Sequence, residues 1–409
     1  MKTLRIFHPD QIDKKKLPQV LAEIQQKQLF KPFSPLIKTF IHEISQALLK
    51  DKDMRSFPEI ISLAHWFRKY SIEILHLDFI DINRKKVVLP RGVILHLAPS
   101  NIDTIFVFSW FISLLMGNSN VIRVSSKGSA SQQALLGKII DILKKDMYLP
   151  IRERQCILTY EHDSDITRLL SKYCDTRVIW GGDQTIKKIR NVEIPPHATE
   201  LIFPDRFSYS LLNAQAIINC KDECLKKLAE NFYNDSYWFD QKACSSPKAV
   251  IWVGETNEVD KAQQYFWVAL NNVISQKKHP ISGASVIQQF SSLCLYASKS
   301  NVVDIINGQA KRVKVSKLTN ELKDQHIGGG IFLELSVLSL EDVSALFQSK
   351  DQTLTVFGFE KNELNLIINS VAKRGIDRVV PVGKALNFSH IWDGFNLLDS
   401  FTREVHIEV

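Results

Sequence analysis

The sequence GVILHLAPSNIDT at residues 92–104 gives the strongest indication of the fold. Residues 93–97 form a short apolar run, which predicts a buried β-strand, and this strand leads directly into the turn residues Pro99-Ser100-Asn101. The apolar stretch at residues 105–116 is too short to span a membrane and predicts a buried helix. In open α/β sheets, ligands bind at the carboxyl ends of the strands, so this turn is a candidate ligand site.

The same alternation of strand and helix continues along the chain. Short apolar runs recur at residues 121–124, 156–160, 177–180 and 200–203, and helical patterns at 132–145 and 165–174 separate them. A second series follows, with predicted helices at 214–231, 258–274, 341–347 and 362–373 and predicted strands at 248–253, 330–335 and 353–357. Strands that are apolar throughout and separated by helices are typical of parallel sheets covered on both faces. We therefore predict an α/β protein with two doubly wound domains.

The two ends of the chain have patterns of their own. Residues 35–50 place apolar side chains at helical spacing, so the first seventy or so residues are expected to be all-helical. Residues 401–409 alternate apolar and polar side chains, which predicts a terminal strand, and pairing with another subunit is one option. The change of register near residue 215 marks a boundary. We expect domains at 1–215, including the helical lead-in, and at 216–385, followed by a C-terminal segment at 386–409 that carries this oligomerisation strand.

Composition excludes several classes of protein. With 409 residues, 45% hydrophobic and 23% charged, the chain is neither collagen-like, low-complexity nor strongly disordered. The start, MKTLRIFHPD, lacks the apolar core of a signal peptide, so we expect a cytoplasmic protein without a membrane span. Six cysteines in such a chain predict reduced thiols.

The net charge of +8 raises the question of a nucleic-acid partner. The basic residues come as scattered pairs, such as Lys85-Lys86 and Lys226-Lys227, and no run concentrates them with interleaved aromatic residues. We therefore expect no nucleic-acid partner. A phosphate-bearing small molecule suits the charge equally well.

Several common motifs are absent from the sequence. It contains no GxGxxG, GxxxxGK[ST] or HExxH motif and no pair of CxxC motifs, so a standard Rossmann fingerprint, a P-loop and the common zinc sites are unsupported. We expect no metal. Cys220 and Cys224 lie four residues apart on a predicted helix and are interpreted as structural cysteines. The run Gly328-Gly329-Gly330 fits a plain turn about as well as a ligand loop.

Cys244 lies in the segment YWFDQKACSSP at residues 237–247. Turn residues and small neighbours surround it, which predicts an accessible thiol, and Lys242 is two positions away. A nearby cation lowers the pKa of a thiol from roughly 8.5 and so favours the reactive thiolate. Cys244 is therefore a candidate nucleophile.

A third segment, GNSNVIRVSSKGS at residues 117–129, ends a predicted strand with Arg123, Ser125, Ser126 and Lys127. Their charges and hydroxyl groups suit a phosphate, although a solvated strand end is the simpler interpretation. Asn101 is likewise open to a simpler interpretation, as an ordinary turn residue.

Together the three segments resemble the aldehyde dehydrogenase superfamily. Its Pro-x-Asn turn, whose Asn helps to bind the oxyanion, is matched by the turn that ends in Asn101. Its adenosine-site segment is similar to residues 117–125, and its strand with a Gly-Ser turn at the cofactor pyrophosphate is similar to VIWGGD at 178–183, which contains Gly181, Gly182 and Asp183. Its catalytic Cys comes later in the chain, as Cys244 does.

The likeness is greater to one branch, the long-chain acyl-CoA reductases known from bacterial luminescence. The matching segments are ACSSP at 243–247, NVIRVSS at 120–126, TVFGF at 355–359 and the ending at 392–403, and they span the chain from about residue 60 onward. The resemblance implies an aldehyde-dehydrogenase-like fold, with a dinucleotide-binding domain within 1–215 and a catalytic cysteine domain within 216–385. It also implies a homo-oligomer and an acyl-protein synthetase partner.

Two departures from the superfamily pattern concern the site. Thr355 stands where the superfamily has a ribose-binding Glu, and the general-base Glu of the oxidising enzymes has only Glu200 as its nearest candidate. An enzyme that makes acids must activate water, whereas a thioester reductase exchanges one thiol for another and then accepts hydride. The missing base is therefore compatible with a reductase.

These observations lead to an expected reaction. Cys244 attacks an acyl thioester, such as a fatty acyl-CoA, Asn101 and the Cys244 backbone N–H hold the oxyanion, and NADPH reduces the acyl-cysteine to an aldehyde. Arg123, with Ser125 or Lys127, would favour the 2′-phosphate of NADPH. The alternatives are a cysteine-dependent acyltransferase or thioesterase without a redox step, and a nucleic-acid-binding or scaffold protein with an inert Cys.

Overall fold

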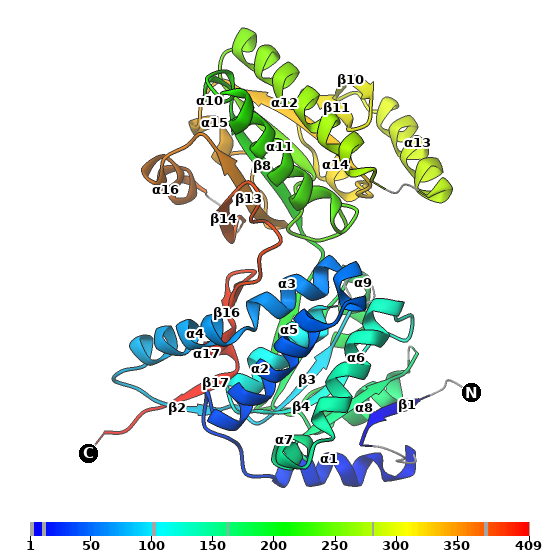
Figure 1. The fold of residues 1–409 in the computed structure, drawn as a ribbon, viewed down its shortest axis with the longest axis vertical. Coiled ribbons are helices and arrows are strands. Elements are labelled where there is room, and N and C mark those ends of the chain that lie inside the picture. Colours follow the sequence, from blue (N-terminus) through cyan, green and yellow to red (C-terminus); the bar gives the residue numbers. More distant parts are fainter. Residues whose placement is uncertain are drawn as a thin grey trace. The chain divides into compact units, whose positions relative to one another are not determined.

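The computed structural model describes residues 4–9, 14–99, 104–161, 163–279, 282–371 and 375–408. The chain forms two compact units, one made of Met1–Asp205 with Phe388–Val409 and the other of Arg206–Asn387. Each unit has its own mainly parallel sheet with helices on its faces (Figure 1). This confirms the prediction of an α/β protein with two doubly wound sheets.

The sheet of the first unit has the strand order β1-β5-β4-β3-β6-β7. Its strands are β1 (Arg5–His8), β3 (Val93–Leu97), β4 (Ser119–Arg123), β5 (Gln155–Thr159), β6 (Thr176–Trp180) and β7 (Thr199–Phe203). All neighbours are parallel except β1, which runs antiparallel to β5. The chain winds outward from β3 through β4 to β5 on one side, and through β6 to β7 on the other. The strand order therefore reverses between β3 and β6, and such a switch point is where open α/β sheets bind ligands.

The helices of this unit cover the sheet and include the lead-in. Every residue of α5 (Ile105–Leu115) is buried, which confirms the helix predicted from its apolar run. The lead-in helix predicted at residues 35–50 is α2 (Pro35–Lys50). The other helices are α1 (Leu17–Gln26), α3 (Pro58–Trp66), α4 (Lys69–Ile82), α6 (Ala130–Leu143), α7 (Leu149–Arg152), α8 (Ser164–Lys172) and α9 (Asp183–Arg190). The expectation of an all-helical lead-in was wrong, because β1 joins the sheet edge and its four residues are too few to show a strand pattern.

The sheet of the second unit has the order β10-β11-β12-β9-β8-β13-β14 and is parallel except for β10. Its strands are β8 (Phe207–Asn213), β9 (Ala249–Val253), β10 (Val302–Asn307), β11 (Lys311–Val315), β12 (Ile331–Val337), β13 (Asp351–Phe357) and β14 (Arg378–Pro381). One face packs against α10 (Ala214–Ile218), α11 (Asp222–Tyr237) and α12 (Thr256–Lys277). The other face packs against α13 (Gly283–Ala297), α14 (Asn320–Asp324), α15 (Glu341–Ser344) and α16 (Lys361–Ser370).

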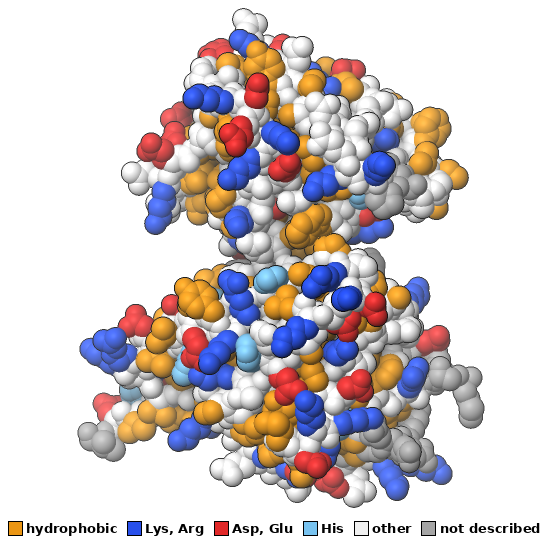
Figure 2. All heavy atoms as spheres, in the orientation of Figure 1, with side chains coloured by type: hydrophobic (Ala, Val, Ile, Leu, Met, Phe, Trp, Pro, Cys, Tyr) orange, Lys and Arg blue, Asp and Glu red, His pale blue; other side chains and the backbone are white. Residues whose placement is uncertain are grey.

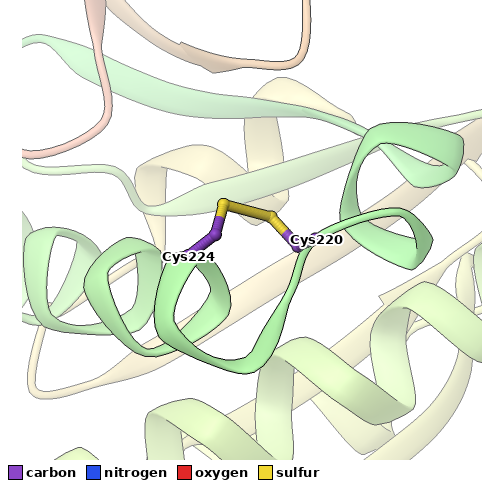
Figure 3. The surroundings of a disulfide bond; sticks show 2 residues. All are labelled: Cys220 and Cys224. Atoms are coloured by element: carbon purple, nitrogen blue, oxygen red, sulfur yellow. A yellow bond between two sulfur atoms is a disulfide. The ribbon is translucent and has the colours of Figure 1, made fainter.

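The helix predicted at residues 214–231 is interrupted between α10 and α11, and a disulfide bond joins Cys220 to Cys224 across this break (Figure 3). The expectation of reduced thiols was therefore wrong for this pair. That expectation rested on the cellular compartment, whereas the local turn brings the two Cα atoms to 5.6 Å, within disulfide range. The other four cysteines, Cys156, Cys174, Cys244 and Cys294, are thiols.

The C-terminal residues return to the first unit. There β17 (Thr402–Val405) pairs antiparallel with β2 (Val87–Pro90) of the same chain. The buried Phe401 just before it accepts a hydrogen bond on its carbonyl oxygen from Asn118 Nδ2 at 2.9 Å. Two short strands, β15 (Ile391–Trp392) and β16 (Phe395–Asn396), and α17 (Leu397–Ser400) complete the segment. Among the described residues, no helix is both long and apolar enough to cross a membrane.

Candidate active site

The turn after β6 places two glycines, Gly181 and Gly182, at the start of α9, so no side chain covers the backbone there. Gly182 is the N-cap of α9, with φ −68°, and a Cβ atom there would meet nothing within 4 Å. A Cβ atom on Gly181 would make only an ordinary 3.6 Å contact with Thr185. The fold itself therefore requires glycine at neither position. Glycines at the open N-terminus of a helix allow a phosphate group to approach the backbone N–H groups, so these two residues fit the predicted pyrophosphate site.

The other predicted cofactor residues differ in their surroundings. Asp183 is exposed in the first turn of α9, where its charge stabilises the helix dipole but repels a phosphate. Ser125 is buried, and its hydroxyl accepts a hydrogen bond from the backbone N–H of Lys127 at 3.2 Å. The Lys127 side chain is exposed. Of these three residues, Lys127 is the one that presents a positive charge to solvent.

Arg123 lies at the carboxyl end of β4, and its side chain forms hydrogen bonds to the residues that follow the two neighbouring strands, β3 and β5. Its guanidinium donates to the carbonyl oxygens of Ala98, just after β3, and Tyr160, just after β5, both at 3.1 Å. The guanidinium also lies 5.5 Å from the centre of the Tyr160 ring, and burial lowers the pKa of Arg123. Part of its hydrogen-bonding capacity is therefore used within the sheet.

Glu200, the candidate general base, is bound by two arginines. Its carboxylate accepts hydrogen bonds from Arg177 Nε at 2.8 Å and Nη2 at 2.5 Å, and it forms an ion pair with Arg190 Nε at 3.2 Å. Arg177 is buried, and removing its partner would leave an uncompensated charge. Glu200 thus has a structural role, and its carboxylate is not available as a base. Asn101, the other catalytic candidate, lies outside the described residues.

Cys244 lies in the second unit, in the turn between α11 and β9. Its thiol is half-buried, and Gln352 Nε2 on β13 donates to Sγ at 3.5 Å. The hydroxyl of Ser208 on β8 donates to the Cys244 carbonyl oxygen at 2.6 Å. Two strands thus fix the position of the Cys244 backbone and thiol.

A positive charge that acts on Cys244 comes from Arg378 on β14. Burial lowers the pKa of Arg378, and its attraction to the Asp235 carboxylate and, less strongly, to the Cys244 thiolate acts in the opposite direction. The Arg378 guanidinium is held in place because it donates to backbone carbonyl oxygens of the following loop. These are the oxygens of Ala385 at 2.8 Å, Lys384 at 3.0 Å and Asn387 at 2.9 Å. Lys242, the cation expected from the sequence, is instead exposed and pairs with Asp240 at 3.1 Å.

Asp235 on α11 connects this loop to the Cys244 turn. Its buried carboxylate accepts hydrogen bonds from the backbone N–H groups of Gly383 at 2.6 Å and Ala385 at 2.9 Å. Its carbonyl oxygen accepts one from the Ser246 hydroxyl at 2.7 Å. Burial raises the pKa of Asp235 to about 7, against the effect of the two amide hydrogen bonds and of Arg378.

The three consecutive glycines support the segment that leads to Cys244. Gly328 and Gly330 have φ values of +82° and +75°, and a Cβ atom on Gly328 would lie 2.9 Å from the Asp240 carbonyl oxygen. The N–H groups of Gly329 and Gly330 donate to Asp240 O at 3.0 Å and Gln241 Oε1 at 2.9 Å. Asp240 and Gln241 themselves have φ values of +52° and +59°, a strained conformation that persists only where surrounding contacts enforce it. The glycine turn is therefore part of the support for Cys244.

Two further site predictions concern a metal and the ribose. Among the described residues, no group of three or more His, Cys, Asp or Glu side chains is placed to hold a metal ion. Thr355 is buried in β13, where its hydroxyl donates to the Tyr209 carbonyl oxygen at 3.3 Å. Thr355 therefore does not replace the ribose-binding Glu of the superfamily.

The fold is that of the aldehyde dehydrogenases. The structure is similar to succinic semialdehyde dehydrogenase from Streptococcus pyogenes in complex with NADP+, with a TM-score of 0.69 and 14% identity over 97% of this chain and 96% of that one. It is also similar to the aldehyde dehydrogenase KauB from Pseudomonas aeruginosa, with a TM-score of 0.68 and 13% identity over 96% of this chain and 87% of that one.

Within that fold, the sequence identifies a family. The model of the acyl-CoA reductase (LuxC) family matches residues 37–404, and the chain belongs to this family. It is 24% identical over 304 residues to the long-chain acyl-protein thioester reductase of Aliivibrio fischeri, a match that covers 72% of this chain and 59% of the relative. The Photorhabdus luminescens protein of the same name is also 24% identical, over 72% of this chain and 58% of its own. The chain thus spans about three fifths of the length of the curated relatives that it matches. These matches confirm the resemblance inferred from the sequence.

Proposed function

We propose that this protein reduces an acyl thioester to an aldehyde through an acyl intermediate on Cys244, with NADPH as the reductant. The observation that carries the proposal is the position of Cys244, which is half-buried in a supported turn, hydrogen-bonded by Gln352 and electrostatically coupled to Arg378. A positive charge near a thiol favours the nucleophilic thiolate. A purely structural cysteine needs neither group.

The steps follow from this arrangement. The Cys244 thiolate attacks the thioester carbonyl, the thiolate of the donor leaves, and the acyl group remains on Sγ. The Asn101 side chain and the Cys244 backbone N–H hold the oxyanion, and losing one such donor typically costs about 3 kcal/mol of transition-state stabilisation. A nicotinamide dinucleotide, when bound, would supply the hydride that reduces this acyl group. The resulting thiohemiacetal on Cys244 then collapses, which releases the aldehyde and restores the thiolate.

The engagement of Glu200 favours reduction over hydrolysis. Its carboxylate is held by Arg177 and Arg190, which makes it a poor base for activating water. An acyl-cysteine that Glu200 does not help to hydrolyse survives longer, until hydride arrives. This supports an aldehyde as the product.

The cofactor is proposed to bind the first unit, with its pyrophosphate at Gly181 and Gly182. Lys127, with Arg123 and Ser125, would bind the 2′-phosphate and so favour NADPH over NADH. Gly182→Ala should lower the melting temperature by no more than a few degrees, because nothing lies within 4 Å of the added Cβ and only the N-cap preference for Gly is lost, but it should weaken NADPH binding at least about tenfold. Fluorescence titration with NADPH measures this. An unchanged affinity would move the pyrophosphate elsewhere, whereas a large loss of melting temperature would contradict the account of Gly182.

The substrate and partners are proposals by similarity. The relatives are named long-chain acyl-protein thioester reductases, which supports a long acyl chain carried on a protein or on CoA. A partner that loads the acyl group, such as an acyl-protein synthetase, and a homo-oligomeric state belong to the same proposal.

The test follows loss of NADPH fluorescence with acyl-CoA thioesters from short to long chain, using the intact protein and Cys244→Ala. We expect turnover that the variant lacks, and mass spectrometry should find the acyl group on Cys244. Acylation without reduction would favour an acyltransferase or thioesterase. Turnover by Cys244→Ala would eliminate the proposed nucleophile.

A further inference from the structure

Helix α13 presents an apolar stripe to solvent. Ile287 and Phe290 are 68% and 65% exposed, and Val286 is 51% exposed. The opposite side of the helix is buried on the sheet through Gln289, Leu293 and Tyr296. In Figure 2 orange side chains gather at this helix, on the right of the view. Leu295 on the same helix is also 42% exposed, and a contiguous exposed apolar patch of this kind marks an interaction site.

The chain around α13 is strongly basic. Residues 277–317 contain seven Lys or Arg and one acidic residue, Asp304, so this segment carries most of the net charge of +8. Helix α13 itself contains no charged residue. Lys277 and Lys278 are exposed before its start, and Lys317 is exposed after β11. In the neighbouring α14, Glu321 pairs with Lys299 and Asp324 with Lys350, so the charges within each pair cancel and Lys299 adds no net positive charge to this surface.

We propose that the α13 face, defined by Val286, Ile287, Phe290 and the flanking lysines, binds the surface of an anionic lipid bilayer. Exposed apolar side chains with lysines close to them in the chain supply the two interactions by which proteins bind the membrane interface, apolar burial and attraction to anionic lipids. The apolar side chains enter the boundary of the acyl chains, and the lysines attract anionic headgroups. This surface is independent of the proposed reductase activity.

The positive charge of the α13 face and its small area favour a lipid bilayer over a second copy of the chain as the binding partner. A second copy of the chain would place the same basic surface opposite itself in a symmetric dimer, which like charges oppose. Three side chains cover only a fraction of the roughly 800 Å² per partner that a stable protein interface buries. Insertion into a bilayer has no such requirement, because the headgroup region adapts to the inserted side chains.

The experiment is flotation of the intact protein with vesicles of phosphatidylcholine alone, or of phosphatidylcholine mixed with phosphatidylglycerol. We expect binding to the mixed vesicles that falls as salt is added, and little binding to the neutral ones. The double variant Ile287→Ser/Phe290→Ser should weaken this binding at least about tenfold. Lys277→Glu/Lys278→Glu should weaken it about as much.

Leu366→Ser is the matched control, since Leu366 is 70% exposed on α16 of the same unit. It should bind mixed vesicles like the unchanged protein, and all variants should melt alike because the substituted side chains are exposed. Failure to float with mixed vesicles would overturn the proposal, as would unchanged binding by Ile287→Ser/Phe290→Ser or an equal loss in Leu366→Ser. Flotation needs neither thioester nor NADPH, so this result is separate from the test of Cys244.

Discussion

The charge of Arg378 allows a test of how the Cys244 thiol is activated. It is half-buried on β14, and three backbone carbonyl oxygens hold its guanidinium. A charge fixed in this way acts on a thiolate more strongly than a mobile surface lysine, because less water screens it. Lys242 is such a surface lysine, and its charge is shared with Asp240.

Arg378→Gln should therefore slow alkylation of Cys244 by iodoacetamide at neutral pH about tenfold, because a smaller fraction of the thiol is ionised. Arg378→Lys keeps the charge and should retain most of the rate. Mass spectrometry of the Cys244 peptide gives the rate separately from that of the exposed Cys294. Arg168→Gln, which removes an exposed guanidinium from the first unit, is the control. Equal rates in Arg378→Gln and the unchanged protein would refute the role.

Asp235 gives a pH-dependent contribution to stability. Its pKa is 3.8 in the reference state and about 7 when buried in the folded chain. Between these values the folded state holds a proton that the unfolded state has lost, so stability falls as pH rises from 3.8 to about 7 and then levels off. The contribution amounts to at most about 4 kcal/mol.

Asp235→Asn removes this titration. The free energy of unfolding of the variant, relative to that of the unchanged protein, should rise across the same pH interval and stay constant above it. Urea unfolding followed by tryptophan fluorescence at a series of pH values measures the difference. Asp165→Asn, at a position 84% exposed, should show no such trend. A difference independent of pH would mean that Asp235 is ionised throughout.

At the scale of elements, the contacts of the glycine turn at 328–330 allow a prediction about the Cys244 turn. A Cβ atom on Gly330 would lie 2.9 Å from Tyr237 Cε1, at a φ of +75° that disfavours any side chain. Gly330→Ala should lower stability by about 2 kcal/mol or more and should also slow Cys244 alkylation, because Tyr237 begins the supported segment. Gly137→Ala in α6 is the matched control. It meets nothing within 4 Å and should raise stability by about 1 kcal/mol without affecting Cys244. A normal rate of Cys244 alkylation in Gly330→Ala would show that the glycine turn does not support Cys244.

The elements that were predicted well are those whose sequence shows one clear pattern of apolar residues. Strands β3 to β7 were predicted to within about two residues, because each contains a short apolar run, and β3 and β6 are buried at every position. The hairpin of β10 and β11 was missed, since its outer strand is largely exposed and mixes apolar with polar residues. The break between α10 and α11 was missed because apolar spacing continues across it.

The candidate site was predictable only where it is local in sequence. Cys244 was predicted from the turn residues around it, and Gly181 and Gly182 from the resemblance of residues 178–183 to the superfamily's cofactor turn. Gln352, Ser208 and Arg378 were not predicted, because they reach Cys244 from β13, β8 and β14, and strand order is not encoded in a local pattern. The pairing of Lys242 with Asp240 was likewise not predicted.

At the scale of the whole molecule, the first unit is assembled from both ends of the chain. The C-terminal residues Phe388, Trp392 and Phe401 belong to it, and Phe108 of α5 lies 4.9 Å from the Phe388 ring and 5.7 Å from the Trp392 ring. Phe401 is fully buried. The second unit, Arg206–Asn387, is by contrast one continuous segment. The two units should therefore respond differently to loss of the C-terminal segment.

A chain that ends at Asn387 should lose the fold of the first unit and keep that of the second. Burial of one such aromatic side chain contributes about 3 kcal/mol or more, so losing three of them, with the β2–β17 pairing, removes an amount comparable to a typical domain stability of about 5–15 kcal/mol. Limited proteolysis should digest residues 1–205 while a fragment near 206–387 survives with Cys244 still alkylated at its usual rate. A chain that ends at Val405 keeps β17 and should resist proteolysis like the intact protein. Resistance of residues 1–205 in the shorter chain would show that the first unit folds without its C-terminal segment.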